Sequence, residues 1–230
     1  MSEVVEHKTT DKEQESDTPK EELGEFEQIE LTQEQLQALL NVDERINIAE
    51  LLETEMVLSR TLYLSEEITL DTITHIIQLI HKFNRDDCDT PAKERQPITI
   101  YLDSAGGEIY RGFSLVSAIE ASQTPVIGVL QGSCMSMCLP IWLACHVKYA
   151  SRFSTVLYHT LRAAADTETL IEMENKLNHY RHLQDTLDAY ILEKTEIPKR
   201  KLKEKRKSNL DWFINFDQMT KYKFYDHLID

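Results

Sequence analysis

The segment that decides the fold runs from residue 98 to residue 144 and reads ITIYLDSAGGEIYRGFSLVSAIEASQTPVIGVLQGSCMSMCLPIWLA. An apolar strand at 98–102 turns at Ser104-Ala105-Gly106-Gly107 into an amphipathic helix that contains Phe113, Val116 and Ile119. A second apolar strand follows at 126–130, and the turn from Gly132 to Met137 leads into a buried helix at 135–144. Two such strand–turn–helix units in succession predict a mostly parallel sheet with right-handed crossovers.

The same alternation continues on both sides of this segment. A strand at 61–64 and a helix at 71–83 precede it, and a strand at 153–158 and a long helix at about 167–194 follow it. The long helix is polar on one face and too long to lie wholly inside the domain, so we expect it to project and to pack on a partner copy. Its periodicity fits a helix that covers one face of the sheet equally well. The pattern as a whole predicts an α/β fold of repeated β-α units.

The charge of the chain divides it into parts. The 230 residues carry a formal net charge of −15, and residues 1–30, with eleven acids and three bases, account for −8 of it. We expect residues 1–30 to be a disordered acidic tail, 31–55 a short helical extension and 56–230 the main domain. An acidic excess also argues against nucleic-acid binding, which relies on clustered Lys and Arg.

The compartment follows from the cysteines and from the apolar runs. There is no secretory signal pattern, and three of the four cysteines lie in one apolar stretch, as reduced core thiols do. The run from Ala121 to Val147 has no charged side chain and is long enough to cross a bilayer. Because Pro125, Gly132 and Pro140 interrupt it, we interpret it as buried core. A cytoplasmic protein without a membrane span is the expectation.

Ser136 is the first candidate for chemistry. It lies on the turn between a buried strand and a buried helix, where several hydrolase folds place their nucleophile. A helix N-terminus favours the negative charge that develops there during acyl transfer. Gly107 and Met137 could each offer a backbone amide to an oxyanion. The flanking residues do not match the G-x-S-x-G pattern, and a serine cap or a tight βα turn would explain these residues without chemistry.

A base and an orienting acid complete the hypothesis. His159 ends the strand at 153–158, so its ring could lie at the same sheet edge as Ser136. His146 competes with it but follows the buried helix at the remote end. The acid could be Asp211, Asp217 or Asp226, and spacing does not choose among them.

Other side-chain clusters predict less. A metal site is not expected, because the spacing of the possible ligands does not match a zinc site; they are Cys134, Cys138, Cys145 and His146. Cys134 is an alternative nucleophile, but Ser136 has the better position on the turn. The basic stretch 199–207 is typical of a solvated surface helix that starts at Pro198, and the acidic tail could meet it.

Taken together, the motifs from Ile98 to His159 resemble the proteolytic subunit of the Clp protease family. The strand ending in Ser104-Ala105-Gly106-Gly107 is similar to the family's Ser-Pro-Gly-Gly turn, and Gly132-Ser133-Cys134-Met135-Ser136-Met137 is similar to its nucleophile turn. The family's histidine follows a short strand, as does His159, and its third acid precedes an aromatic residue, as does Asp211. Tyr222-Lys223-Phe224-Tyr225-Asp226 echoes the family's closing pattern, so the resemblance covers about Met56 to Leu228.

The resemblance implies a ClpP/crotonase-like fold and a serine endopeptidase. Position by position, Ser136 looks like the nucleophile, His159 the general base, Asp211 its orienting acid, and Gly107 and Met137 the oxyanion amides. The long helix looks like the handle through which two rings of identical or paralogous subunits stack around a chamber for polypeptide substrates. An ATP-driven unfoldase of the AAA+ class is the implied partner, and no cofactor is implied for this chain.

The sequence departs from the family at several positions. Ala105 replaces a proline, Lys223 a glycine, and Cys134 and Cys138 small residues, while Leu161 to Ala165 replaces a glycine-rich strand that lines the substrate groove. Three rival functions follow: a catalytically silent ring subunit, a crotonase-like enzyme acting on acyl thioesters, and a capsid-maturation peptidase. The tail at 1–30 occupies the family's gating end, so we expect it to screen the entrance.

Overall fold

The computed structural model describes residues 48–164 and 167–229. The predicted tail at 1–30, and the predicted extension at 31–55 as far as residue 47, lie outside the described residues. The first described element is helix α2, Ile48–Ser59, which crosses the predicted boundary between residues 55 and 56. That division of the chain therefore stays a prediction.

Among the described residues, seven strands form one sheet whose main path runs β1-β2-β3-β4-β7. Their bounds are β1 Thr61–Leu64, β2 Ile98–Ser104, β3 Val126–Met135, β4 Val147–Ala150, β5 Thr155–Tyr158, β6 Trp212–Ile214 and β7 His227–Leu228. The first half of β3 pairs with β4 and its last residues pair with β5, so the sheet forks along this strand. Every strand pair is parallel except β5 with β6, which confirms the predicted mostly parallel sheet.

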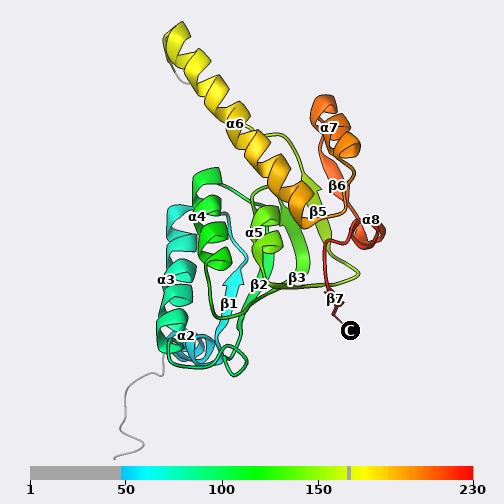
Figure 1. The fold of residues 1–230 in the computed structure, drawn as a ribbon. Coiled ribbons are helices and arrows are strands. Elements are labelled where there is room, and N and C mark those ends of the chain that lie inside the picture. Colours follow the sequence, from blue (N-terminus) through cyan, green and yellow to red (C-terminus); the bar gives the residue numbers. More distant parts are fainter. Residues whose placement is uncertain (1–47, 165–166, 230) are drawn as a thin grey trace, which may run out of the picture. The chain divides into compact units, whose positions relative to one another are not determined.

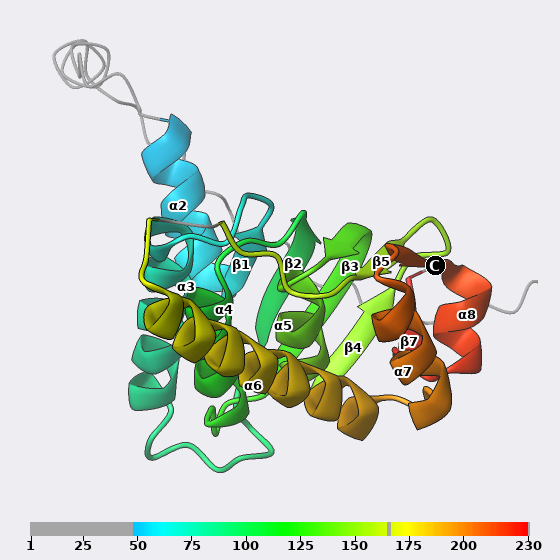
Figure 2. The ribbon, with the colours of Figure 1, turned by 90° about the horizontal axis from the view of Figure 1, so that it is seen from above.

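Three helices, α3, α4 and α5, lie side by side, and α6 packs against the last of them (Figure 1). The bounds of the helices after α2 are α3 Leu70–Asp86, α4 Ile109–Glu120, α5 Cys138–Ala144, α6 Leu170–Lys194, α7 Lys199–Ser208 and α8 Phe216–Lys221. Figure 1 shows α3, α4 and α5 in a row, and α4 contacts both of its neighbours. Helix α6 packs on α5 and runs across this row in the view of Figure 2.

The core follows from the spacing of the apolar side chains. Helix α3 begins at a capping box formed by Thr69 and Thr72, and one face of it is buried; that face consists of Ile73, Ile76, Leu79, Ile80 and Phe83. Strand β2 buries every second residue at 98, 100 and 102, and α5 is buried along its whole length. Helix α5 therefore lies in the centre of the core, beside the strands that carry the candidate site.

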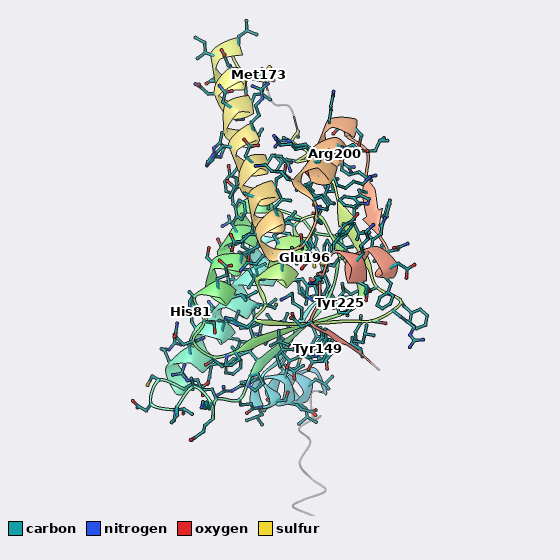
Figure 3. All side chains as sticks on the ribbon, turned by 45° about the vertical axis from the view of Figure 1, so that its right-hand side comes forward. His81, Tyr149, Met173, Glu196, Arg200 and Tyr225 are labelled. Carbon is teal, nitrogen blue, oxygen red and sulfur yellow. The ribbon has the colours of Figure 1, made fainter. Side chains whose placement is uncertain are left out.

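Helix α6 projects as its length predicted. Its outer half is exposed, with Leu170 83% accessible, whereas Leu183, Gln184, Asp188 and Ile191 at its base are buried. Figure 3 shows Met173 near the free end of the helix. The helix begins at Leu170 rather than at 167, because the side chain of Thr169 caps it in a box with Glu172. The partner copy on this helix stays a prediction.

Some predicted bounds were wrong. Strand β3 continues to Met135, so the buried helix begins at Cys138 rather than at residue 135. The strand expected at 153–158 begins at Thr155. The segment from Ala121 to Val147, weighed as a bilayer span, contains all of β3 and α5. None of the described helices is both long and apolar enough to cross a membrane.

Candidate active site

Ser136 lies on a strained turn between β3 and α5. Its φ is +54°, in the left-handed region that a residue with a Cβ rarely adopts. The Ser136 amide donates to the Leu157 carbonyl at 3.0 Å, and its carbonyl accepts from the Leu139 amide at 3.1 Å. The backbone on both sides of the turn thus holds the hydroxyl at the end of the strand.

A glycine turn after β2 packs directly against this serine. Gly106 has φ +97°, and a Cβ there would lie 2.7 Å from both the Met135 carbonyl oxygen and the Ser136 Cβ. Gly107 has φ +150°, and a Cβ there would lie 2.4 Å from the Ile68 carbonyl oxygen. Both positions exclude side chains, which explains why this turn needs two glycines.

His159 follows β5, the strand that pairs in parallel with the end of β3. The register aligns Met135 with Leu157, so the carboxyl ends of the two strands meet at one edge of the sheet. At this edge, Ser136 follows β3 and His159 follows β5. The ring nitrogen Nδ1 of His159 lies 2.6 Å from the Thr160 carbonyl oxygen.

His146, the competing histidine, lies at the opposite edge. Its Nδ1 accepts a hydrogen bond from the Val126 amide at 2.9 Å, at the start of β3. Burial lowers the pKa of His146, which keeps the ring neutral in this position. Its role is to complete the hydrogen bonding of the strand start.

One cavity of about 500 Å³ joins the predicted groups. Ser136, His159, Gly107 and Met137 all line it. The remaining wall is largely apolar and includes Ile109, Leu139, Pro140, Leu161, Leu187 and Ile191. Within the described part of the chain, the amides of Gly107 and Met137 donate to no other group. They are therefore free to bind an oxyanion in this cavity.

The three candidate acids separate in the structure. Asp226 lies away from the cavity, where it accepts from the backbone amide of Lys148 and forms an ion pair of 3.1 Å with the Lys148 ammonium group. Asp217 lies in the first turn of α8. Asp211 immediately precedes β6, and His159 immediately follows β5; the antiparallel ladder between these strands ends at the pair Tyr158 and Trp212. Of the three acids, Asp211 is thus the one that adjoins the last paired residues beside the histidine.

The expected contact between His159 and Asp211 is not made. Asp211 Oδ1 instead accepts from Arg162 Nη2 at 2.5 Å, and the histidine faces the Thr160 carbonyl. The structure thus brings the predicted serine, histidine and amides to one cavity, whereas Asp211 does not line it and is paired with Arg162. Assignment of these five residues to catalysis remains a proposal.

Sequence reasoning missed the polar network behind the histidine. Gln184 Oε1 accepts from the Leu161 amide at 2.6 Å, and Gln184 Nε2 donates to Asp188 at 2.8 Å. Asp188 also accepts from the Tyr158 hydroxyl at 2.8 Å and from Arg206 at 3.1 Å. These contacts fix the segment that follows β5 to the base of α6. A polar pair at spacing four on the otherwise apolar face of α6 was the available signal.

The cysteines do not form a second reactive centre. Cys134, Cys138 and Cys145 are buried and free, and burial raises the pKa of Cys145 to about 12. Burial likewise raises the pKa of Cys134, so neither of these two thiols ionises readily. Across residues 48–164 and 167–229, no group of three metal-binding side chains is arranged to hold an ion.

Comparison with known proteins gives concordant results. A proteolytic subunit of the ATP-dependent Clp protease from Deinococcus radiodurans is 27% identical over 137 residues, which are 59% of this chain and 66% of that relative. The corresponding subunit 2 from Treponema pallidum is 26% identical over 178 residues, 75% of this chain and 83% of that one. The chain thus spans slightly less than two thirds of the first relative.

The fold is also found among solved structures. A mutant of ClpP1 from Listeria monocytogenes is similar with a TM-score of 0.65 at 16% identity, over 78% of this chain and 96% of that one. This likeness establishes the ClpP-like α/β fold. Residues 44–230 match the family model for Clp protease. Because this match covers most of the chain, the protein belongs to the Clp protease family.

Proposed function

We propose that this chain is a serine-type endopeptidase that cleaves peptides or unfolded polypeptides. The observation that carries the proposal is the shared cavity, in which Ser136, His159 and two free backbone amides converge from neighbouring strand ends. Membership of the Clp protease family supports it. The apolar wall suits the side chains that an unfolded polypeptide exposes.

The proposed reaction proceeds through an acyl-enzyme. Ser136 Oγ attacks the peptide carbonyl carbon while His159 Nε2 takes its proton. The Gly107 and Met137 amides donate to the oxygen on which negative charge develops. The imidazolium then protonates the leaving amine, the C–N bond breaks, and water activated by the same histidine releases the product. Asp211 would stabilise the imidazolium if it accepted from Nδ1.

The assembly is part of the proposal. The exposed outer half of α6, with Leu170 and Ile171, is suited to stack against α6 of another copy, which would close two rings around a chamber. Both curated relatives are named as subunits of an ATP-dependent protease, so an AAA+ unfoldase is the proposed partner. We also propose a cytoplasmic location and no cofactor in this chain.

A fluorophosphonate probe tests the chemistry. The full-length chain should be labelled, and Ser136→Ala should abolish labelling without changing the mass of the assembly in native mass spectrometry. Ser117→Ala is the matched control, because Ser117 is exposed on α4 away from the cavity, and it should be labelled like the parent. Equal labelling of Ser136→Ala and parent would refute the assignment.

A catalytically silent ring subunit is the second candidate. The ion pair of Asp211 with Arg162 favours it, because it keeps the acid from the histidine. Such a subunit would assemble with paralogous active copies and would show no labelling at Ser136. A folded and assembled sample that the probe does not modify would therefore support this second function.

A further inference from the structure

His159 and Asp211 flank the last residue pair of two adjacent strands. Strands β5 and β6 are antiparallel, with Leu157 opposite Phe213 and Tyr158 opposite Trp212. The ladder ends at this pair, and His159 and Asp211 are the next residues on the two chains. Directly opposed residues of an antiparallel pair have Cα atoms about 4.5–5.5 Å apart and side chains on the same face. Extension of the ladder by one pair would therefore bring the carboxylate and the imidazole together.

The side chains do not use this arrangement. The Asp211 carboxylate binds the guanidinium of Arg162 at 2.5 Å. His159 Nδ1 lies 2.6 Å from the Thr160 carbonyl oxygen, and because a carbonyl can only accept, this nitrogen donates. The carbonyl thus selects the tautomer with a free Nε2. A neutral carbonyl lacks the charge with which a carboxylate stabilises an imidazolium.

The ion pair between Arg162 and Asp211 lies at the surface. The side chain of Arg162 is 70% exposed and that of Asp211 36% exposed. Other contacts hold the residues next to Arg162: the Leu161 amide donates to Gln184 and the Thr160 hydroxyl donates to the Asn209 side chain. Exposed ion pairs are weak, and a pair of this kind shifts an equilibrium by about two- to fivefold. Rotation of one arginine side chain is sufficient to free the acid.

We infer that Arg162 is a positioning residue that competes with His159 for Asp211. While its guanidinium holds the carboxylate, the histidine stays on the Thr160 carbonyl and the triad is unassembled. When the guanidinium turns away, Asp211 accepts from His159 Nδ1. The inference rests on the proposed function, and Arg162 acts through Asp211 rather than on the reacting atoms.

The first test measures the rate of fluorophosphonate labelling at Ser136 in the full-length chain. Arg162→Gln should label about two- to fivefold faster than the parent, the factor that the ion pair can hold. Arg162→Lys keeps the positive charge and should show a smaller gain. The gain should disappear when Arg162→Gln is combined with Asp211→Asn, measured against Asp211→Asn alone. Arg200→Gln on α7 (Figure 3) is the control, because Arg200 makes no ion pair within the described residues, and it should label like the parent.

The second test is spectroscopic and does not require activity. The proton on His159 Nδ1 should resonate further downfield in Arg162→Gln than in the parent, because a bond to a carboxylate is stronger than one to a carbonyl. The shift should be absent in the combined variant with Asp211→Asn.

The outcomes separate the two proposals. An unchanged resonance together with unchanged labelling would overturn the role of Arg162 and leave the peptidase proposal standing. A downfield shift in a chain that is never labelled would support the role of Arg162 and refute the peptidase proposal. A gain in labelling that persists with Asp211→Asn would overturn the competition, because Arg162 would then act without the acid.

Discussion

Ser133 donates two hydrogen bonds to the carboxylate of Asp103. The amide and the hydroxyl of Ser133 both lie 2.7 Å from Asp103 Oδ1. Asp103 precedes Gly106 by three residues and Ser133 precedes Ser136 by three, so the pair joins the strand ends that carry the two turns of the site. The hydrogen bond from the Ser133 amide lowers the pKa of Asp103 and keeps it charged at neutral pH.

Loss of this carboxylate should disturb the site without removing any group that reacts. We expect Asp103→Ala to slow fluorophosphonate labelling by about tenfold, because small displacements of reacting groups have effects of this size or larger. Asp103→Asn keeps an acceptor oxygen and should label within about twofold of the parent. Labelling of Asp103→Ala at the parent rate would show that the two turns hold their positions without the pair.

Gly106 should be intolerant of any side chain. A Cβ would contact the Ser136 Cβ and the Met135 carbonyl oxygen at 2.7 Å, and φ of +97° is unfavourable for alanine. We expect Gly106→Ala to lower the free energy of unfolding by about 1–3 kcal/mol and to abolish labelling. The neighbouring exposed Ala105→Ser is the control in urea unfolding and labelling. A Gly106→Ala protein with parental stability would contradict the described turn.

Asp87 should be a major contributor to stability. It binds Arg60 through two bonds of 2.6 and 2.8 Å and accepts from the Thr124 hydroxyl at 2.8 Å; the side chain of Asp87 is 7% exposed and that of Arg60 14%. Asp87→Ala leaves the Arg60 charge without its partner, so we expect a loss of about 3 kcal/mol in urea unfolding. Asp86→Ala, which breaks an exposed pair with Lys82, should lose less than about 1 kcal/mol.

The same pair sets an acid limit to stability. The hydrogen bond from Arg60 lowers the pKa of Asp87 in the folded chain below its unfolded value of about 4. The stabilisation is therefore complete above pH 4 and is lost as the pH falls through the lower folded value. The difference in unfolding free energy between parent and Asp87→Asn should be constant above about pH 4 and should shrink as the pH falls below it. A difference that stays unchanged well below about pH 4 would contradict the linkage.

Thiol reactivity should distinguish one cysteine from the other three. Cys88 is exposed, whereas Cys134, Cys138 and Cys145 are buried. Iodoacetamide should therefore modify one thiol in the native chain and four in urea, as counted by mass spectrometry. Cys88→Ser should remove the native modification. Rapid native modification of Cys134, two residues before Ser136, would indicate that the core beside the site opens.

The sequence predicted the units of the fold better than their ends. The strands at 98 and 126 and the helix at 71–83 were predicted because each has a clear apolar period. Strand β3 runs further than expected because its last residues, which read QGSCM, are polar and small and are held by β5 and Asp103. Strand β4 was missed because its four residues, VKYA, show no period of their own.

The choice of the acid could not come from spacing. Asp211, Asp217 and Asp226 lie at comparable distances along the chain from His159, and only the antiparallel pairing of β5 with β6 brings the residue before β6 near the residue after β5. A three-residue strand such as β6 gains its register from the partner strand rather than from its own pattern. The ion pair of Asp211 with Arg162 could not be predicted either, because Arg162 lies in a segment without regular structure.

The left-handed backbone at Ser136 sets function against stability. A residue with a Cβ at φ +54° costs about 1–3 kcal/mol, a cost that glycine does not incur. Ser136→Gly should therefore be inert toward the probe and yet melt at a higher temperature than the parent, whereas the chemically closer Ser136→Thr should be the less stable variant. At position 136, the amino acid that is chemically closest to serine, threonine, fits the backbone worst, and glycine, which has no hydroxyl, fits it best.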